Sequence, residues 1–265
     1  MSALEFKASS TQKIIEMEKA YLAACAAPLD GMWQSFADMA DIYEILSDQN
    51  TVGYAAINGN NELLRFHVSK QFDPVPALVA LIDKMELSGA VVSTAEPLAL
   101  AALMDVQRSV STRAIMYHLP GIQSAQTPLF PEDTQLKPVG ADDLETVADF
   151  AHRTLGASLD WLLSYFDGLI REGELHALWR GTEVLSTGEC RRNRRQPAVA
   201  DVGMIVGKAH RRMGIATEML KALVQIAGEQ SLSPICSTES DNIGAQKAIC
   251  AAGFVGYHRI LNLSF

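Results

Sequence analysis

Arg211, Arg212 and Gly214 lie between an apolar segment and a helical one, and their chemistry suits a phosphate group. Apart from Asp201, residues 201–206 are apolar and partly β-branched, which predicts a buried strand, and helical periodicity begins at Met213. The first backbone N–H groups of a helix lack intrahelical partners, and the helix dipole is positive there. Glycine lets an anion approach the main chain, and the arginines supply charge. The alternative is an ordinary strand-to-helix turn with solvated arginines.

A second strand and helix follow at a regular distance. The segment Pro234–Thr238 predicts a strand, and the segment Asn242–Ala252 predicts a helix that ends at Gly253-Phe254. The two strand–helix units together indicate an α/β fold.

The motifs Arg211-x-x-Gly214-x-Ala216, Asn242-x-x-Ala245 and Gly253-Phe254, in this order and spacing, resemble the GCN5-related N-acetyltransferase (GNAT) superfamily. The resemblance covers residues 136–265. It implies a mixed, mostly antiparallel sheet with flanking helices and one splayed parallel strand pair that forms a V-shaped slot. We expect a β-bulge in residues 201–206 to open this slot.

The resemblance also implies acetyl-CoA as the cofactor. The loop would hold the pyrophosphate through backbone amides, and the preceding strand would pair with the pantetheine arm. The position of Asn242 would lie close to the cofactor. The expected cofactor-binding residues are Met204, Ile205, Val206, Arg211, Arg212, Met213, Gly214, Ile215, Ala216 and Asn242.

The reaction implied is direct acyl transfer to an amine, with the oxyanion bound by strand amides at Ile205 and Val206. Glu189, in a strand predicted over residues 184–191, is the candidate general base. Asp201, Glu239 and His258 are alternatives, and each of the four can instead be a solvated or ion-paired residue.

The sequence departs from the family pattern at the residue that usually acts as the general acid. A tyrosine usually lies four residues before the glycine of Gly253-Phe254, and here that residue is Ile249. A thiol leaving group with a pKa of about 8.5 needs less protonation than an alkoxide. The adjacent Cys250 is expected to pack in the core.

Two features concern the acceptor. Trp161, Tyr165 and Phe166 lie on one side of a helix predicted over residues 159–172 and either line the acceptor pocket or pack in the core. The basic run Arg191–Arg195 fits a solvated hairpin loop, with contact to an adenosine 3′-phosphate or an acidic substrate as the alternative.

The chain divides at a proline-containing segment. We expect an N-terminal domain over residues 1–120, a linker over 121–135 and the acetyltransferase domain over 136–265. The first part repeats the element order of the second, which indicates tandem GNAT-like folds.

The first copy has lost the phosphate loop. Its corresponding residues are Phe72-Asp73-Pro74-Val75-Pro76-Ala77, in which two prolines remove backbone donors and Asp73 repels phosphate. We therefore expect this half to be structural and not to bind CoA.

Composition and charge bear on the number of domains, the partners and the location of the protein. The 265 residues include 48% hydrophobic and 20% charged residues, enough for two cores. The net charge of −9 argues against nucleic acid as a partner. The four cysteines have neither metal-ligand nor disulfide spacing, so we expect no metal site and a reducing, cytoplasmic location. No signal peptide or membrane-spanning run is visible, so we expect no membrane association. We expect a monomer or a homodimer.

These features predict an acetyl-CoA-dependent N-acetyltransferase that acts on a small-molecule or peptide amine. A non-catalytic CoA-binding or regulatory module, and an acyltransferase that uses a longer acyl-CoA, stay open as alternatives.

Overall fold

The computed structural model describes residues 4–120 and 127–265, which form two compact units. One unit contains the chain up to Met116 together with His258–Phe265, and the other contains Tyr117–Tyr257. Residues 121–126 of the expected linker lie outside the described residues. The second unit therefore ends before the chain does, whereas the sequence led us to expect residues 136–265 in one domain.

The first unit contains a sheet with the strand order β1-β2-β3-β4-β5-β12-β6, in which β12 is the C-terminal strand. Its elements are β1 (Leu4–Ala8), α1 (Ile15–Ala24), α2 (Gly31–Asp38), β2 (Asp41–Ser47), β3 (Asn50–Ile57), β4 (Glu62–Val68), α3 (Pro74–Met85), β5 (Gly89–Ser93), α4 (Pro97–Val106), β6 (Ser109–His118) and the end of β12 (Val255–Ser264).

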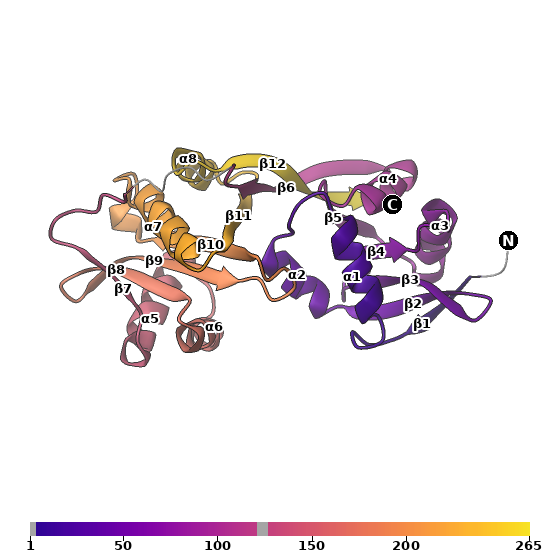
Figure 1. Ribbon diagram of the computed structural model, residues 1–265, viewed down its shortest axis with the longest axis horizontal. Helices are drawn as coiled ribbons and strands as arrows, with labels where there is room; N and C mark the ends of the chain where they lie inside the picture. Colours follow the sequence, from indigo (N-terminus) through magenta and orange to yellow (C-terminus); the bar gives the residue numbers. More distant parts are fainter. Residues whose placement is uncertain (1–3, 121–126) are drawn as a thin grey trace. The chain divides into compact units, whose positions relative to one another are not determined.

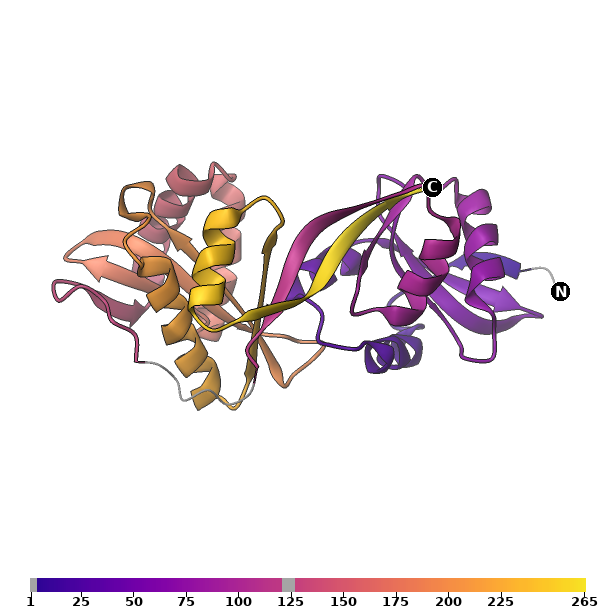
Figure 2. The ribbon, with the colours of Figure 1, turned by 90° about the horizontal axis from the view of Figure 1, so that it is seen from above.

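Helices cover both faces of this sheet. Ala77 and Leu78 of α3 and Leu103 of α4 belong to one apolar core, and α3 and α4 lie side by side (Figure 2). Helices α1 and α2 contribute Tyr21 and Trp33 to a second core. The C-terminal strand joins this unit because Leu263 is buried in the first core and Ile260 in the second.

The second unit contains a sheet with the strand order β11-β10-β9-β8-β7. Its elements are β7 (Gln135–Pro138), a short 3₁₀ helix η1 (Ala141–Asp143), α5 (Leu144–Leu155), α6 (Leu159–Glu172), β8 (Leu175–Arg180), β9 (Glu183–Arg192), β10 (Val199–Val206), a second 3₁₀ helix η2 (Lys208–His210), α7 (Ile215–Glu229), β11 (Ser233–Glu239) and α8 (Ile243–Ala251).

Helices α5 and α6 lie on one face of this sheet and α7 on the other (Figure 1). Val147 of α5 and Phe166 of α6 are buried against strands β8 and β9. On the opposite face α7 packs so closely that a Cβ at Gly188 of β9 would lie 2.5 Å from Sδ of Met219. The edge of β10 therefore lies between the layer of α5 and α6 and the layer of α7.

The predicted splay of a parallel pair is confirmed. Strands β10 and β11 pair in parallel only from Val199 opposite Ser233 to Asp201 opposite Ile235, and the rest of β10 has no partner in β11. The expected β-bulge is wrong, because β10 pairs with β9 residue by residue from Ala200 to Val206. The slot therefore opens because β11 diverges, with no extra residue in β10.

Apart from two short 3₁₀ helices, the two halves of the chain have the same order of helices and strands, as the sequence indicated. In the first unit β4 and β5 also pair in parallel over only two positions, Glu62 opposite Gly89 and Leu63 opposite Ala90. Strands β1, β8 and β12 were not expected from the sequence.

Two further observations concern membrane spans and metal-binding groups. No helix within residues 4–120 and 127–265 combines the length and the apolar character that a bilayer span requires. Within the same ranges, no group of three or more His, Cys, Asp or Glu side chains is arranged to hold a metal ion.

Candidate functional site

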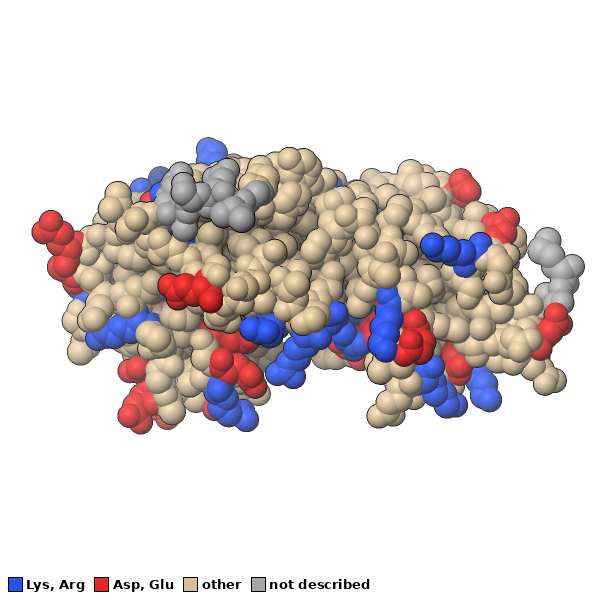
Figure 3. Space-filling view, viewed as in Figure 1, with Lys and Arg blue, Asp and Glu red and all other residues tan. Residues whose placement is uncertain are grey.

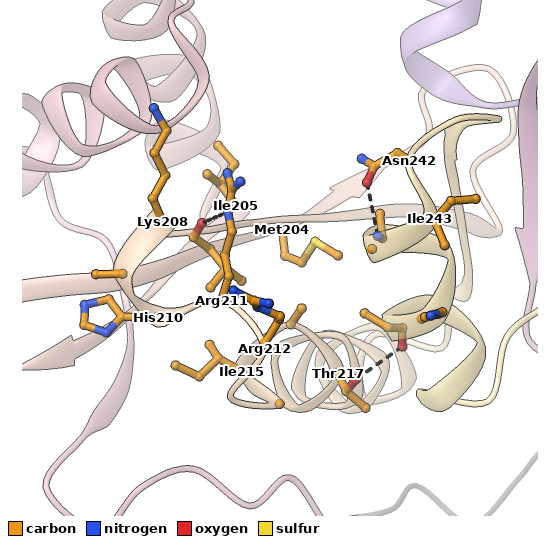
Figure 4. A pocket seen from close by; sticks show the side chains of 18 of the residues that line it. Met204, Ile205, Lys208, His210, Arg211, Arg212, Ile215, Thr217, Asn242 and Ile243 are labelled. Carbon is orange, nitrogen blue, oxygen red and sulfur yellow. Dashed lines mark hydrogen bonds between the residues drawn. The ribbon is translucent and has the colours of Figure 1, made fainter.

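A cavity of about 910 Å³ lies in the second unit, where the end of β10, the start of α7 and the start of α8 meet (Figure 4). Four of its lining side chains are the cations Lys208, Arg211, Arg212 and Lys247, and none of the described lining residues is acidic. On the face drawn in Figure 3, by contrast, acidic and basic side chains are interspersed. In a chain of net charge −9, such a lining selects an anionic ligand.

The start of α7 supplies hydrogen-bond donors to this cavity. Gly214 precedes the helix with φ +83°, and no side chain of the described residues caps the helix start. The first intrahelical bond of the α-helical type runs from the N–H of Glu218 to the carbonyl of Gly214 (3.1 Å). The N–H groups of residues 215–217 therefore lack an intrahelical acceptor. An added Cβ at Gly214 would meet no atom within 4 Å, so the space in front of these donors is open.

The exposed edge of β10 supplies further backbone groups. The N–H of Gly207 donates to the carbonyl of Leu185 in β9 (2.9 Å), which makes this a hydrogen-bonded position of the antiparallel pair. Because such positions alternate, the amide of Ile205 also faces β9, while the amides of Met204 and Val206 face the slot. This geometry corrects the expected role of the Ile205 amide, since it points away from the slot.

Helix α8 closes the other side of the cavity. The side chain of Asn242 accepts a hydrogen bond from the N–H of Ala245 (3.2 Å) and so caps α8. Thr217 of α7 donates to the carbonyl of Ala248 (3.4 Å) and links the two helices. The side chain of Met204 points from β10 into the space between them (Figure 4).

Nine of the ten residues that the sequence singled out for cofactor binding line this cavity, and the structure brings them together from three elements. The exception is Met213, whose side chain is 59% exposed and which is not among the lining residues. Sequence reasoning missed Lys208, His210 and Lys247, although Lys208 and His210 lie within the same loop. Their basic character was the signal that could have found them.

The candidate base Glu189 lies on the α6 face of the sheet. One carboxylate oxygen accepts a hydrogen bond from the Tyr165 hydroxyl (2.6 Å), and the other lies 3.4 Å from Nε of Arg191. Glu189 is opposite Gly203 of β10, where an added Cβ would lie 2.8 Å from Oε1. Burial is the main cause that raises the pKa of Tyr165, and the Glu189 charge adds to it, so the phenol stays protonated and donates.

The three alternative bases are placed differently. Asp201 is buried and accepts a hydrogen bond from the Asn193 amide (3.1 Å). Glu239 is the exposed last residue of β11. His258 belongs to the first unit, where its Nδ1 lies 3.1 Å from the Thr94 hydroxyl. Glu189 and Asp201 both lie on the same sheet face as Ile205, which lines the cavity, and neither carboxylate is itself a lining residue. Glu189 is opposite Gly203, so it is nearer to Ile205 along the strands than Asp201 is.

Ile249, at the position where the family usually has a tyrosine general acid, is a packed apolar residue. Ile249 is buried and is not among the residues that line the cavity. Cys250 is exposed, which corrects its expected place in the core. Its neighbour Ile249 is the buried residue of α8, so the short helix turns Cys250 outward.

The aromatic residues of α6 divide between the two roles considered. Phe166 is a core residue, whereas Trp161 is 52% exposed and stacks on Tyr165. In the basic run, the Asn193 side chain accepts hydrogen bonds from the N–H groups of Arg195 and Gln196, as in a hairpin loop. Arg194 lies 4.0 Å from Glu172.

The equivalent helix of the first unit begins in another way. The side chain of Asp73 accepts a hydrogen bond from the N–H of Val75 (3.1 Å), and Pro74 and Pro76 have no N–H. The start of α3 therefore offers no free donor in its first three residues. A cavity of only about 10 Å³ lies beside the end of β4 and the start of α4.

Comparison with known proteins agrees with this geometry. A model described as an acetyltransferase (GNAT) domain matches residues 10–119, and one described as the acetyltransferase (GNAT) family matches residues 143–254. The chain is similar to a solved GNAT-family acetyltransferase from Colwellia psychrerythraea, with 33% identity, a TM-score of 0.92, and coverage of 98% of this chain and 99% of that one. No curated protein matches.

Two more distant structures share the fold. A tandem GNAT protein from the clavulanic acid biosynthesis pathway is 16% identical, with a TM-score of 0.71 and coverage of 99% of this chain and 98% of that one. A GCN5-related N-acetyltransferase from Sphaerobacter thermophilus is 13% identical, with a TM-score of 0.73 and coverage of 98% and 95%.

Both halves thus have the fold of an acyltransferase domain. The chain belongs to the GNAT family as a tandem of two such domains, and it is an enzyme of the N-acetyltransferase class.

Proposed function

We propose that the second unit transfers an acetyl group from acetyl-CoA to an amine and that the first unit binds no cofactor. The observation that carries the proposal is the uncapped start of α7, which opens into a cavity lined by four cations. Helix N-termini with free N–H groups bind phosphate, and cavities of about 300–1,000 Å³ hold ligands of moderate size.

The residues fit the parts of acetyl-CoA in order. The N–H groups of residues 215–217, with Arg211 and Arg212, would hold the pyrophosphate. The edge of β10 would accept the pantetheine arm as an additional strand, since its outward amides and carbonyls have no partner in β11. Bound acetyl-CoA supplies a thioester whose acetyl group is the one transferred.

The chain's own groups then have defined roles. The amide of Val206 would donate a hydrogen bond to the thioester oxygen. Glu189, held in place by the Tyr165 hydroxyl, would accept a proton from the ammonium group of the acceptor, and the neutral amine would then attack the thioester. The amine nitrogen bonds to the acetyl carbon as the carbon–sulfur bond breaks, and CoA leaves as a thiolate. The nitrogen loses its second proton as the amide forms, and because Ile249 cannot donate a proton, this second proton passes through water to the thiolate.

A thiol-release assay tests this function. Acetyl-, succinyl- and octanoyl-CoA are compared with a panel of primary amines, and the product is identified by mass spectrometry. We expect an N-acetyl amide from acetyl-CoA, and a decrease of about 10²–10³-fold in kcat for Glu189→Gln. Release of thiol from octanoyl-CoA at a higher rate than from acetyl-CoA would contradict the acetyl specificity.

A further inference from the structure

The first turn of α6 presents an exposed tryptophan in a fixed orientation. Trp161 stacks on Tyr165 with ring centroids 5.0 Å apart and an angle of 7° between the planes. The Ser158 side chain accepts a hydrogen bond from the N–H of Trp161 (3.4 Å), which fixes this turn. Tyr165 covers one face of the indole, and the side chain is still 52% exposed. A ligand ring can therefore pack on Trp161 without moving it.

Exposed apolar residues lie along the chain between a cavity-lining residue and this tryptophan. Leu155 at the end of α5 lines the cavity and is 55% exposed, and Leu159 at the start of α6 is 38% exposed. The connection between them is held by His152, whose Nδ1 lies 2.6 Å from the carbonyl of Ala157. Single exposed apolar residues are common, but three of them within seven positions of the chain, the first lining a cavity and the last with an aromatic ring, favour a binding surface.

The charges beside this surface favour a cation. The Tyr165 ring that supports Trp161 carries the hydroxyl that donates to Glu189, so the indole and the carboxylate are one side chain apart. In α6, Asp167 pairs with Arg171 and Glu172 lies 4.0 Å from Arg194, so Asp160, next to Trp161, is the acidic side chain of this helix without an ion pair to another described residue. The nearby Arg191 is already ion-paired with Glu189. A carboxylate next to an aromatic face is suited to an ammonium group.

We infer that the acceptor is an aromatic primary amine without an acidic group, and that Trp161 determines this specificity. The inference rests on the proposed function, because it assigns the acceptor of the same site. The ring of the acceptor packs on Trp161 and Leu155, and its ammonium group reaches Glu189. The transfer forms the amide bond and breaks the thioester bond, and of the two protons that the ammonium nitrogen loses, one goes to Glu189 and the other through water to the CoA thiolate.

Three amines that differ in one feature each test the inference in the thiol-release assay: 2-phenylethylamine, ethanolamine and phenylalanine. We expect kcat/KM for 2-phenylethylamine to exceed that for each of the other two by at least about 30-fold. In Trp161→Ala the ratio of kcat/KM between 2-phenylethylamine and ethanolamine should fall about tenfold, mainly through KM. Equal use of the three amines, or an unchanged ratio in the variant, would overturn the inference.

Tyr257→Ala is the matched control. Tyr257 is also an exposed stacked aromatic (59% exposed), with its ring 4.4 Å from that of His118, and it lines no described cavity. Its truncation should leave the ratio of the two amines unchanged. A fall equal to that in Trp161→Ala would show a general loss of stability instead of lost recognition.

Two binding measurements separate the inference from the proposed function. Acetyl-CoA is titrated calorimetrically, and 2-phenylethylamine is titrated by tryptophan fluorescence in the presence of CoA. Failure of acetyl-CoA to bind would overturn the proposed function. Binding of acetyl-CoA without a fluorescence change from the amine, or with an equal change in Trp161→Ala, would overturn the acceptor assignment alone.

Discussion

The position of the Glu189 carboxylate depends on Gly203, which has no side chain. Its carboxylate lies over Gly203 in the neighbouring strand, where a methyl group would lie 2.8 Å from Oε1. The Tyr165 hydroxyl holds the other oxygen. Because Gly203 and the Tyr165 hydroxyl together fix the Glu189 carboxylate, it loses little conformational entropy when the acceptor binds. Catalysis is then sensitive to small displacements of this carboxylate.

Gly203→Ala should therefore displace the carboxylate. We expect kcat to fall roughly tenfold or more, because a displacement of about 1 Å is costly to catalysis, while the Kd of acetyl-CoA changes less than about twofold. Steady-state kinetics and calorimetry measure the two quantities. Gly168→Ala, at an open site in α6, is the control and should leave kcat unchanged. Unchanged kcat in Gly203→Ala would contradict the role of Glu189.

Glu96 in the first unit gives a pH dependence of stability. Burial raises its pKa from 4.5 to about 7, although hydrogen bonds from Tyr21 and Ser93 oppose the shift. A raised pKa in the folded state means that its contribution is full below about pH 4.5 and is lost as the pH rises through about 7.

The unfolding free energy of the first unit should fall by roughly 1–3 kcal/mol between these pH values because of Glu96. Denaturant titrations at several pH values measure this fall, and it should be smaller in Glu96→Gln. An identical pH dependence in both proteins would contradict the assignment.

At the scale of elements, α7 and α3 are equivalent helices, but the N-terminus of α7 has no side-chain cap and that of α3 is capped. Helix α7 begins after Gly214 without a cap, and its first N–H groups face a cavity. Helix α3 begins with two prolines, and the Asp73 carboxylate occupies the remaining donor. The same fold thus offers a phosphate site at one helix start and a self-capped helix start at the other.

Asp73→Ala separates capping from ligand binding. Loss of the cap should lower the unfolding free energy of the first unit by about 1 kcal/mol, and the Kd of acetyl-CoA should change less than about twofold. Denaturant titration and calorimetry test the two expectations. A large loss of acetyl-CoA affinity would show that the first copy takes part in binding.

The sequence predicted these elements well where local signals are strong. The strand and helix around Gly214 follow from a change of apolar period and from the loop motif. The direction of the Ile205 amide depends on which neighbour β10 pairs with at that point, and the splay arises from the path of β11. Such long-range pairing leaves no mark in a local pattern, so the bulge and the Ile205 amide were assigned wrongly.

At the scale of the whole molecule, the C-terminal strand explains why the domain division expected from the sequence differs from the compact units. Residues His258–Phe265 belong to the first unit, and β12 pairs antiparallel with β5 from Ile260 to Ser264. The end of the chain therefore stabilises the half that precedes it in sequence. A chain-order division cannot show this, because it assigns each residue to the nearest domain along the sequence.

Leu263→Ala tests this contribution. Leu263 is 5% exposed within the core that α3 and α4 cover, so its truncation should cost about 2–4 kcal/mol in the unfolding free energy of the first unit. The unfolding transition that acetyl-CoA stabilises belongs to the second unit and should keep its midpoint. Denaturant titration with and without acetyl-CoA distinguishes the two transitions. A loss confined to the acetyl-CoA-dependent transition would contradict the assignment of the strand.

Calorimetric titration of acetyl-CoA into the whole chain tests the central claim most directly. The open start of α7 and the capped start of α3 predict one acetyl-CoA per chain, with binding weakened at least about 100-fold in Gly214→Asp, because the added carboxylate would repel the pyrophosphate. The site has room for a side chain, but the positive φ of residue 214 strains any residue other than glycine, so circular dichroism checks that the variant is folded. Two acetyl-CoA molecules per chain, or unchanged affinity in folded Gly214→Asp, would contradict the account.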